Sequence, residues 1–152
     1  MVLRIVSGGQ TGVDRAALDF ALSKGLPHGG WCPKGRRAED GRIEERYRLV
    51  ETSSRSYRQR TEWNVRDSDG TLVITGNPKR SGGTRYTMKM ARKLGRPCIA
   101  VDPDDPDAPD EVLRWLESNG VGTLNVAGPR ESTDPAIYDS AMAFLERLYR
   151  LR

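Results

Sequence analysis

Short apolar runs alternate along this chain with segments that repeat apolar residues every three or four positions. Residues 2–6 form an apolar, β-branched run that ends at Ser7-Gly8-Gly9, which predicts a strand. Residues 13–24 carry apolar side chains on one face and are followed by Gly25, which predicts a helix. Residues 29–31 favour a further short strand.

The second half of the chain continues this alternation. Thr133-Asp134-Pro135 predicts the start of the last helix, with Asp134 as its N-cap and Pro135 at its first position. The predicted strands cover residues 71–75, 97–102 and 123–127, and the other predicted helices cover 56–67, 83–94 and 110–118.

Strands that alternate with helices of about 10–15 residues are typical of βαβ units and a parallel sheet. The pattern therefore predicts an α/β fold: a single Rossmann-like domain over residues 1–152, with a mainly parallel sheet of about five strands and helices on both faces. Ligands of such sheets bind beyond the carboxyl ends of the strands. The polar, irregular stretch 33–56 predicts no definite elements.

Composition narrows the functional classes. The net charge is +4, with 25 basic and 21 acidic residues interleaved along the chain, which favours a small anionic partner over nucleic acid. No apolar run approaches the ~18 residues of a membrane span, and no signal peptide is visible. Two cysteines and one histidine make neither a disulfide framework nor a metal cage. These features predict a cytoplasmic protein without a membrane or metal partner.

The loop after the first predicted strand reads Ser7-Gly8-Gly9-Gln10-Thr11-Gly12 and leads into a helix. Glycines let the backbone approach an anion, and a helix N-terminus offers free N–H groups to it. The loop matches two of the three glycines of the dinucleotide fingerprint and lacks the lysine of a P-loop. We therefore expect an oxyanion rather than NAD at Gly8, Gly9, Gln10, Thr11 and Gly12.

A second loop of the same kind follows the strand at residues 71–75. Ser81-Gly82-Gly83-Thr84 opens the next helix, and Lys79 and Arg80 add positive charge just before it. Two such loops in one small domain predict that both hold the same anionic ligand. Aspartate in place of Gly9 or Gly83 is then expected to block the anion.

Further candidates flank these loops. Arg15 is able to clamp an anion and Asp14 to accept a sugar hydroxyl, although both also suit the start of an ordinary helix. The segment from Lys34 through Arg36 to Arg37, followed by Glu39 and Asp40, predicts either a lid over the ligand or a solvated loop. Arg60 and Asn64 are four residues apart and share a helix face, which points either into the crevice or to solvent.

Together these motifs resemble the SMF–LOG (SLOG) superfamily of Rossmann-like ligand-binding proteins, in particular its circularly permuted branch, labelled putative molybdenum carrier proteins. The resemblance covers nearly the whole chain. It rests on residues 7–15, 31–41, 57, 60–65, 68–71 and 81–84.

The resemblance implies a carrier or sensor of a phosphorylated pterin or nucleotide, with molybdenum cofactor as one candidate, and a homo-oligomer. The superfamily also contains phosphoribohydrolases, whose Pro-Gly-Gly-x-Gly-Thr-x-x-Glu run supplies a glutamate for N-glycosidic bond cleavage. In this chain Thr87 stands where that glutamate would fall. A nucleotide-processing hydrolase that uses Asp14, Glu39 or Asp40 as acid or base stays the alternative.

Overall fold

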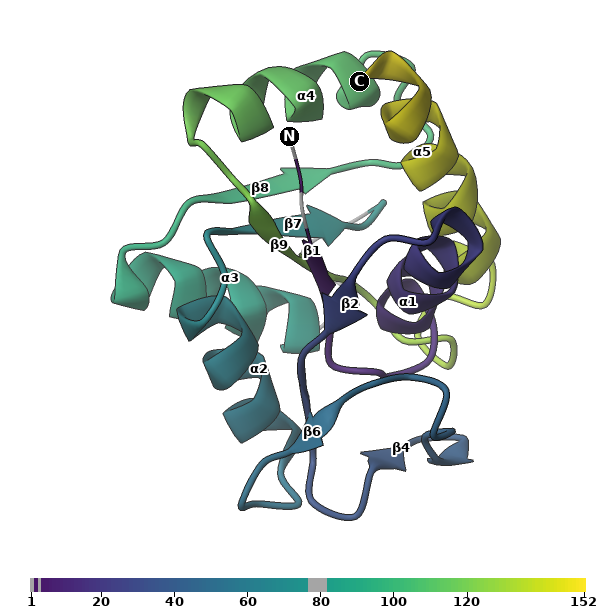
Figure 1. The fold of residues 1–152 in the computed structure, drawn as a ribbon, viewed down its shortest axis with the longest axis vertical. Helices are drawn as coiled ribbons and strands as arrows, with labels where there is room; N and C mark the ends of the chain where they lie inside the picture. Colours follow the sequence, from purple (N-terminus) through teal and green to yellow (C-terminus); the bar gives the residue numbers. More distant parts are fainter. Residues whose placement is uncertain (1, 3, 77–81) are drawn as a thin grey trace.

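The computed structural model describes residues 2, 4–76 and 82–152, and Figure 1 shows their arrangement. A sheet of five strands forms the centre, in the order β2-β1-β9-β7-β8, and every neighbouring pair is parallel. The predicted α/β, Rossmann-like fold is confirmed. The strands are β1 (Arg4–Val6), β2 (His28–Gly29), β7 (Gly70–Ile74), β8 (Cys98–Val101) and β9 (Thr123–Ala127).

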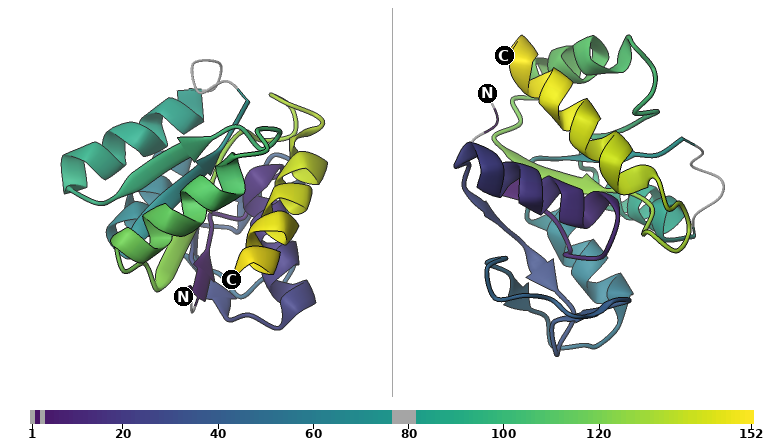
Figure 2. Two further views of the ribbon diagram at one scale, coloured as in Figure 1. Left: turned by 90° about the horizontal axis from the view of Figure 1, so that it is seen from above. Right: turned by 90° about the vertical axis from the view of Figure 1, so that its right-hand side faces the viewer.

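Helices cover both faces of this sheet (Figure 2). The larger apolar cluster packs α1 (Val13–Lys24), α4 (Ala108–Ser118) and α5 (Ile137–Leu151) against one face. A smaller cluster joins α2 (Tyr57–Arg66) and α3 (Gly82–Leu94) on the other. None of the helices in the described ranges is long and apolar enough to cross a bilayer.

The predicted start of the last helix was wrong by two residues. Helix α5 begins at Ile137 with Ala136 as its N-cap, so Pro135 lies before the helix. The carboxylate of Asp134 still accepts a hydrogen bond from the backbone N–H of Ala136 at 3.3 Å. Asp134 therefore shapes the turn that leads into the helix, as short acidic side chains commonly do.

The polar stretch after β2 forms a small lobe at the lower end of the molecule (Figure 1). Gly30, with φ +128°, turns the chain out of the main sheet, and a Cβ at this position would collide with the carbonyl oxygen of Ser7. The lobe holds two small two-stranded sheets. Strand β3 (Trp31–Cys32) pairs with β6 (Val50–Glu51), and β4 (Arg37–Ala38) pairs with β5 (Gly41–Arg42).

Buried groups hold this lobe in place. A small apolar core of the lobe packs against Leu18 of α1. It consists of Cys32, Ala38, Ile43, Tyr47 and Leu49. Asp19, also on α1, accepts hydrogen bonds from the hydroxyls of Tyr47 and Tyr138, each at 2.5 Å. The lobe, α1 and α5 are therefore joined at one carboxylate.

Candidate functional site

A cleft of about 760 Å³ opens at the carboxyl edge of the main sheet. The loop after β1, the end of β9 with its following loop, and the first residues of both α2 and α3 form its walls. This is the edge at which parallel α/β sheets bind ligands. The lining residues are Gly8, Gln10, Asp14, Arg37, Ser56, Tyr57, Arg58, Arg60, Thr61, Asn64, Gly82, Gly83, Tyr86, Thr87, Asn125, Val126, Ala127, Gly128, Arg130 and Thr133.

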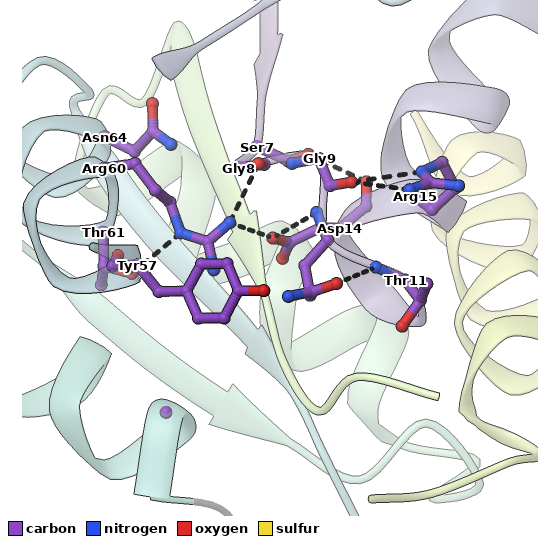
Figure 3. Close-up of polar contacts among 12 residues, drawn as sticks. Ser7, Gly8, Gly9, Thr11, Asp14, Arg15, Tyr57, Arg60, Thr61 and Asn64 are labelled. Carbon is purple, nitrogen blue, oxygen red and sulfur yellow. Dashed lines mark hydrogen bonds and ion pairs between the residues drawn. The ribbon is translucent and has the colours of Figure 1, made fainter. Parts of the chain in front are cut away.

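Arg60 carries a buried positive charge into this cleft. It is 8% exposed, and its Nη1 donates to the carbonyl oxygen of Gly8 at 2.9 Å and to Asp14 Oδ2 at 3.4 Å (Figure 3). Its Nε donates to Thr61 Oγ1 at 3.2 Å, and the Tyr57 ring lies 5.2 Å from the guanidinium carbon. Within the described residues, Nη2 makes no hydrogen bond, so its N–H groups are left to donate to a ligand.

Gly8 makes this approach of Arg60 possible. A Cβ on Gly8 would lie 2.7 Å from Arg60 Cδ and 2.9 Å from Cζ, so any larger residue would push the guanidinium aside. The first glycine-rich loop thus admits an arginine side chain at Gly8.

Asp14 brings a negative charge to the same wall, in the first turn of α1. Its Oδ2 accepts from the backbone N–H of Gln10 at 3.3 Å and from Arg60. Burial raises the pKa of Asp14, and the charge of Arg60 and the Gln10 N–H oppose this shift. A carboxylate with long hydrogen bonds in a low-dielectric wall is able to accept further bonds from a ligand.

The rest of the first loop is engaged within the protein. Thr11 N–H donates to Gln10 Oε1 at 3.0 Å, Gly9 N–H to Ser7 Oγ at 3.4 Å, and Val13 N–H to the carbonyl of Pro129 at 3.2 Å. Gly9, with φ +78°, turns its α-carbon toward Ile43 and Leu49 in the core of the lobe. Aspartate at Gly9 would therefore disrupt the core rather than block an anion, which corrects that expectation.

The second loop falls partly outside the described residues, because Lys79, Arg80 and Ser81 belong to the range 77–81. Gly82 and Gly83 line the cleft at the start of α3, where helix N–H groups favour an anion. Thr84 is buried and lies outside the lining. Thr87 does line the cleft, and its hydroxyl donates to the carbonyl of Gly83 at 3.0 Å.

Two arginines expected at the ligand hold the protein together instead. Arg15 donates from Nε and Nη2 to the carbonyl of Gly9 and from both Nη atoms to Asp40. Arg36 is 5% exposed and donates to four backbone carbonyls of the lobe, those of Ile43, Glu44, Tyr47 and Leu49. The side chain of Lys34 is exposed, away from the cleft lining.

Asn64 has a double role. Its amide accepts from the backbone N–H of Trp31 at 2.8 Å and donates to the carbonyl of the same residue at 3.0 Å, which ties β3 to α2. It also lines the cleft beside Arg60, as the four-residue spacing on α2 predicted.

A network around Glu39 joins three segments behind the cleft. Its carboxylate accepts from Thr11 Oγ1, from Ser132 Oγ at 2.6 Å and from Ser132 N–H at 3.1 Å, and lies 3.7 Å from Arg130 Nε. Its own N–H donates to Gln10 Oε1 at 2.9 Å. Burial alone raises the pKa of Glu39, but the bonds from Ser132 and Thr11 together outweigh it and hold the pKa below the ordinary value. Glu39 therefore supports the cleft wall without lining it.

Several lining residues were not named as site residues from the sequence. Arg37, which belongs to the segment expected as a lid, lies 4.5 Å from the Tyr57 ring, and Arg58 lies 5.1 Å from the Tyr86 ring, so two cation–aromatic pairs stand at the cleft. The end of β9 and the loop to Arg130 form the remaining wall. A signal was present there, because Asn125 is a polar residue inside an apolar strand, with Gly128 just beyond the strand's end.

Comparison with known proteins places this site in a family. Residues 5–149 match the model of the circularly permutated YpsA SLOG family. The chain belongs to this family. The resemblance seen in the sequence is thereby confirmed. In this chain β9 lies between β1 and β7 and is the central strand of the sheet.

A solved member of similar structure is the crystal structure of a putative molybdenum carrier protein from Syntrophus aciditrophicus. It is 46% identical to this chain, with a TM-score of 0.92 over 97% of this chain and 94% of the other. None of the curated proteins compared with the chain matches it.

Proposed function

We propose that this chain binds a phosphorylated small molecule in the cleft, a nucleotide or a phosphorylated pterin, and acts as a carrier or sensor rather than a hydrolase. The observation that carries the proposal is Arg60. The side chain of Arg60 is 10% exposed at the cleft, and its Nη2 makes no hydrogen bond among the described residues, so it is able to donate a charge-assisted hydrogen bond to an anion there.

The surroundings of Arg60 support an anion. Four arginines line the cleft (Arg37, Arg58, Arg60 and Arg130), against Asp14 as the acid among its lining residues. The helix α3 starts at the cleft with two glycines, and the N-terminus of a helix favours a phosphate. A volume of about 760 Å³ lies within the range of small-molecule sites and suits an organic phosphate of nucleotide size.

Molybdenum cofactor fits this cleft through its organic part. No lining residue is a cysteine, and Cys32 is fully buried outside the cleft. In the described ranges no group of three His, Cys, Asp or Glu side chains is placed to hold a metal ion. The arginines and the start of α3 would bind the phosphate, and the polar groups of β9 and α1 would contact the pterin.

Calorimetric titration of Arg60→Gln tests the proposal. We expect the parent protein to bind AMP or a phosphorylated pterin, and the variant to bind the same compound at least about tenfold more weakly, because a charge-assisted hydrogen bond is lost. Arg66→Gln is the matched control, since Arg66 is exposed at the other end of α2 and pairs with Asp67. A folded Arg60→Gln protein with unchanged affinity would overturn the proposal.

The wider setting is part of the same proposal. We propose a cytoplasmic protein, in agreement with two cysteines that form no disulfide. We also propose a homo-oligomer, because α1 and α5 lie side by side with Leu22 and Leu151 exposed. Light scattering at high micromolar concentration checks this, and a monomeric mass would contradict it.

A further inference from the structure

Asp14 is unexpected in a cleft built for an anion. It is 7% exposed, yet it lines the cleft and stands at the helix N-terminus where a glycine-rich loop would ordinarily hold a phosphate. Its carboxylate accepts a hydrogen bond from the backbone N–H of Gln10, and this N–H is therefore not free to donate to an anion. The first loop is therefore closed to a bare oxyanion by the protein's own negative charge.

The position of Asp14 is held firmly. Ser7 Oγ donates to its carbonyl oxygen at 2.8 Å, and Arg60 of α2 donates to its carboxylate at 3.4 Å. Asp14 Oδ2 accepts two long hydrogen bonds, from the Gln10 N–H at 3.3 Å and from Arg60 Nη1 at 3.4 Å. A carboxylate has about four acceptor positions, so Asp14 is able to accept further hydrogen bonds. A ligand that lies against Arg60 therefore also meets a carboxylate that accepts a hydrogen bond from an N–H or O–H donor and repels a negative oxygen.

Charge separates two kinds of ligand at this point. A small oxyanion such as molybdate or phosphate on Arg60 has negative oxygens on every side and is repelled by the neighbouring carboxylate. A phosphate ester has one oxygen bonded to carbon, so it is able to turn its charged oxygens toward Arg60 and the start of α3 and its uncharged organic side toward Asp14. Its sugar hydroxyl, ring N–H or amino group then reaches Asp14.

We propose that Asp14 is the specificity-determining residue of the cleft: it accepts a hydrogen bond from an uncharged donor of an organic phosphate and excludes bare oxyanions. This inference rests on the proposed function and names the ligand class more narrowly. On this proposal the cleft binds molybdenum inside an organic cofactor and excludes free molybdate.

The test compares parent, Asp14→Asn and Arg60→Gln proteins by calorimetric titration with AMP, GMP, a phosphorylated pterin, inorganic phosphate and sodium molybdate. We expect the parent to bind at least one of the three organic phosphates at least about tenfold more tightly than either inorganic anion. Asp14→Asn keeps the shape and removes the charge. This variant should bind the organic phosphate about tenfold more weakly than the parent and bind the inorganic anions more tightly.

The outcomes are distinct. If Asp14→Asn weakens all ligands by one common factor, Asp14 only positions Arg60, and the inference is wrong. Parent protein that binds molybdate as tightly as any organic phosphate also overturns it, while the cleft and Arg60 stand. If Arg60→Gln binds like the parent, or the parent binds none of the five compounds, the proposed function itself fails and takes this inference with it.

Discussion

Arg60 and Asp14 place opposite charges in one buried wall, 3.4 Å apart. Isolated charges in such a place cost several kcal/mol, and a pair offsets that cost only when its remaining hydrogen bonds are satisfied. Here both partners keep unsaturated positions toward the cleft. We therefore expect these two residues, more than the glycine-rich loops, to decide what the cleft binds.

Gly82 offers a clean test of the anion at the start of α3. A Cβ there meets nothing within 4 Å, so Gly82→Asp should fold, and an acid in the first helical turn is favourable. We expect it to weaken binding of AMP by more than about tenfold, because it puts a negative charge where we propose that the phosphate binds. Gly82→Asn, which has the same shape without the charge, is the control and should bind nearly as the parent. Equal affinity of both variants would argue against a phosphate at α3.

Thr87 predicts the absence of hydrolysis. It stands where the phosphoribohydrolase glutamate would fall, its hydroxyl is bound to the carbonyl of Gly83, and a hydroxyl is no general acid or base near neutral pH. We expect no base release from AMP above background in a chromatographic assay. Steady turnover near the ~10 s⁻¹ of a typical enzyme would favour the hydrolase instead.

At the scale of elements, the hairpin of β4 and β5 is fastened to the cleft by two carboxylates. Glu39 bonds to the loops after β1 and β9, and Asp40 pairs with Arg15 at 3.0 Å. The hydrogen bond from Arg15, outweighing burial, lowers the pKa of Asp40, and the pKa of Glu39 is also lowered. The hairpin therefore depends on both groups being ionised.

Because the pKa values of Glu39 and Asp40 are lowered in the folded protein, the stabilisation that these two carboxylates provide depends on pH in a defined way. The stabilisation is fully present above the ordinary values of 4.5 for Glu39 and 3.8 for Asp40, and is lost as the pH falls through the lower folded values. We expect Glu39→Gln to lower the free energy of unfolding at pH 7 by about 1–2 kcal/mol and to flatten its fall in acid. Urea denaturation at a series of pH values measures both. Glu44→Gln, an exposed acid of the same lobe, should change neither.

At the scale of the whole molecule, the sheet and its two helix layers carry the stability, and the cleft lies at their edge. Phe144 of α5 is fully buried in the larger apolar cluster. We expect Phe144→Ala to lower the free energy of unfolding by about 3–5 kcal/mol, because it leaves a cavity. Val50→Ala, at a position 60% exposed, should cost less than about 0.5 kcal/mol. Denaturant titration compares the two, and similar losses would contradict this view of the core.

Local pattern was enough to predict most of the main elements. The helix at residues 13–24 and the strand at 123–127 have the predicted bounds, and the other main helices and strands differ by a few residues at their ends. Periodicity and glycine stops are properties of neighbouring residues, so they can be recognised in the sequence alone. The same pattern predicted a ligand site at the carboxyl edge of the sheet, where the structure has its cleft, and the family followed from ordered motifs along the chain.

The roles of the polar side chains were decided by tertiary structure, because their partners lie far away in the chain. Arg60 meets Gly8 across 52 positions, and Glu39 meets Ser132 across 93. The charge of Arg36 suggested a ligand-binding residue. In the fold, however, its guanidinium donates hydrogen bonds to four backbone carbonyl groups, which its five N–H donors are able to satisfy together. Sequence determined which residues stand near the sheet edge, and packing determined which of them keep a hydrogen-bonding position open to a ligand.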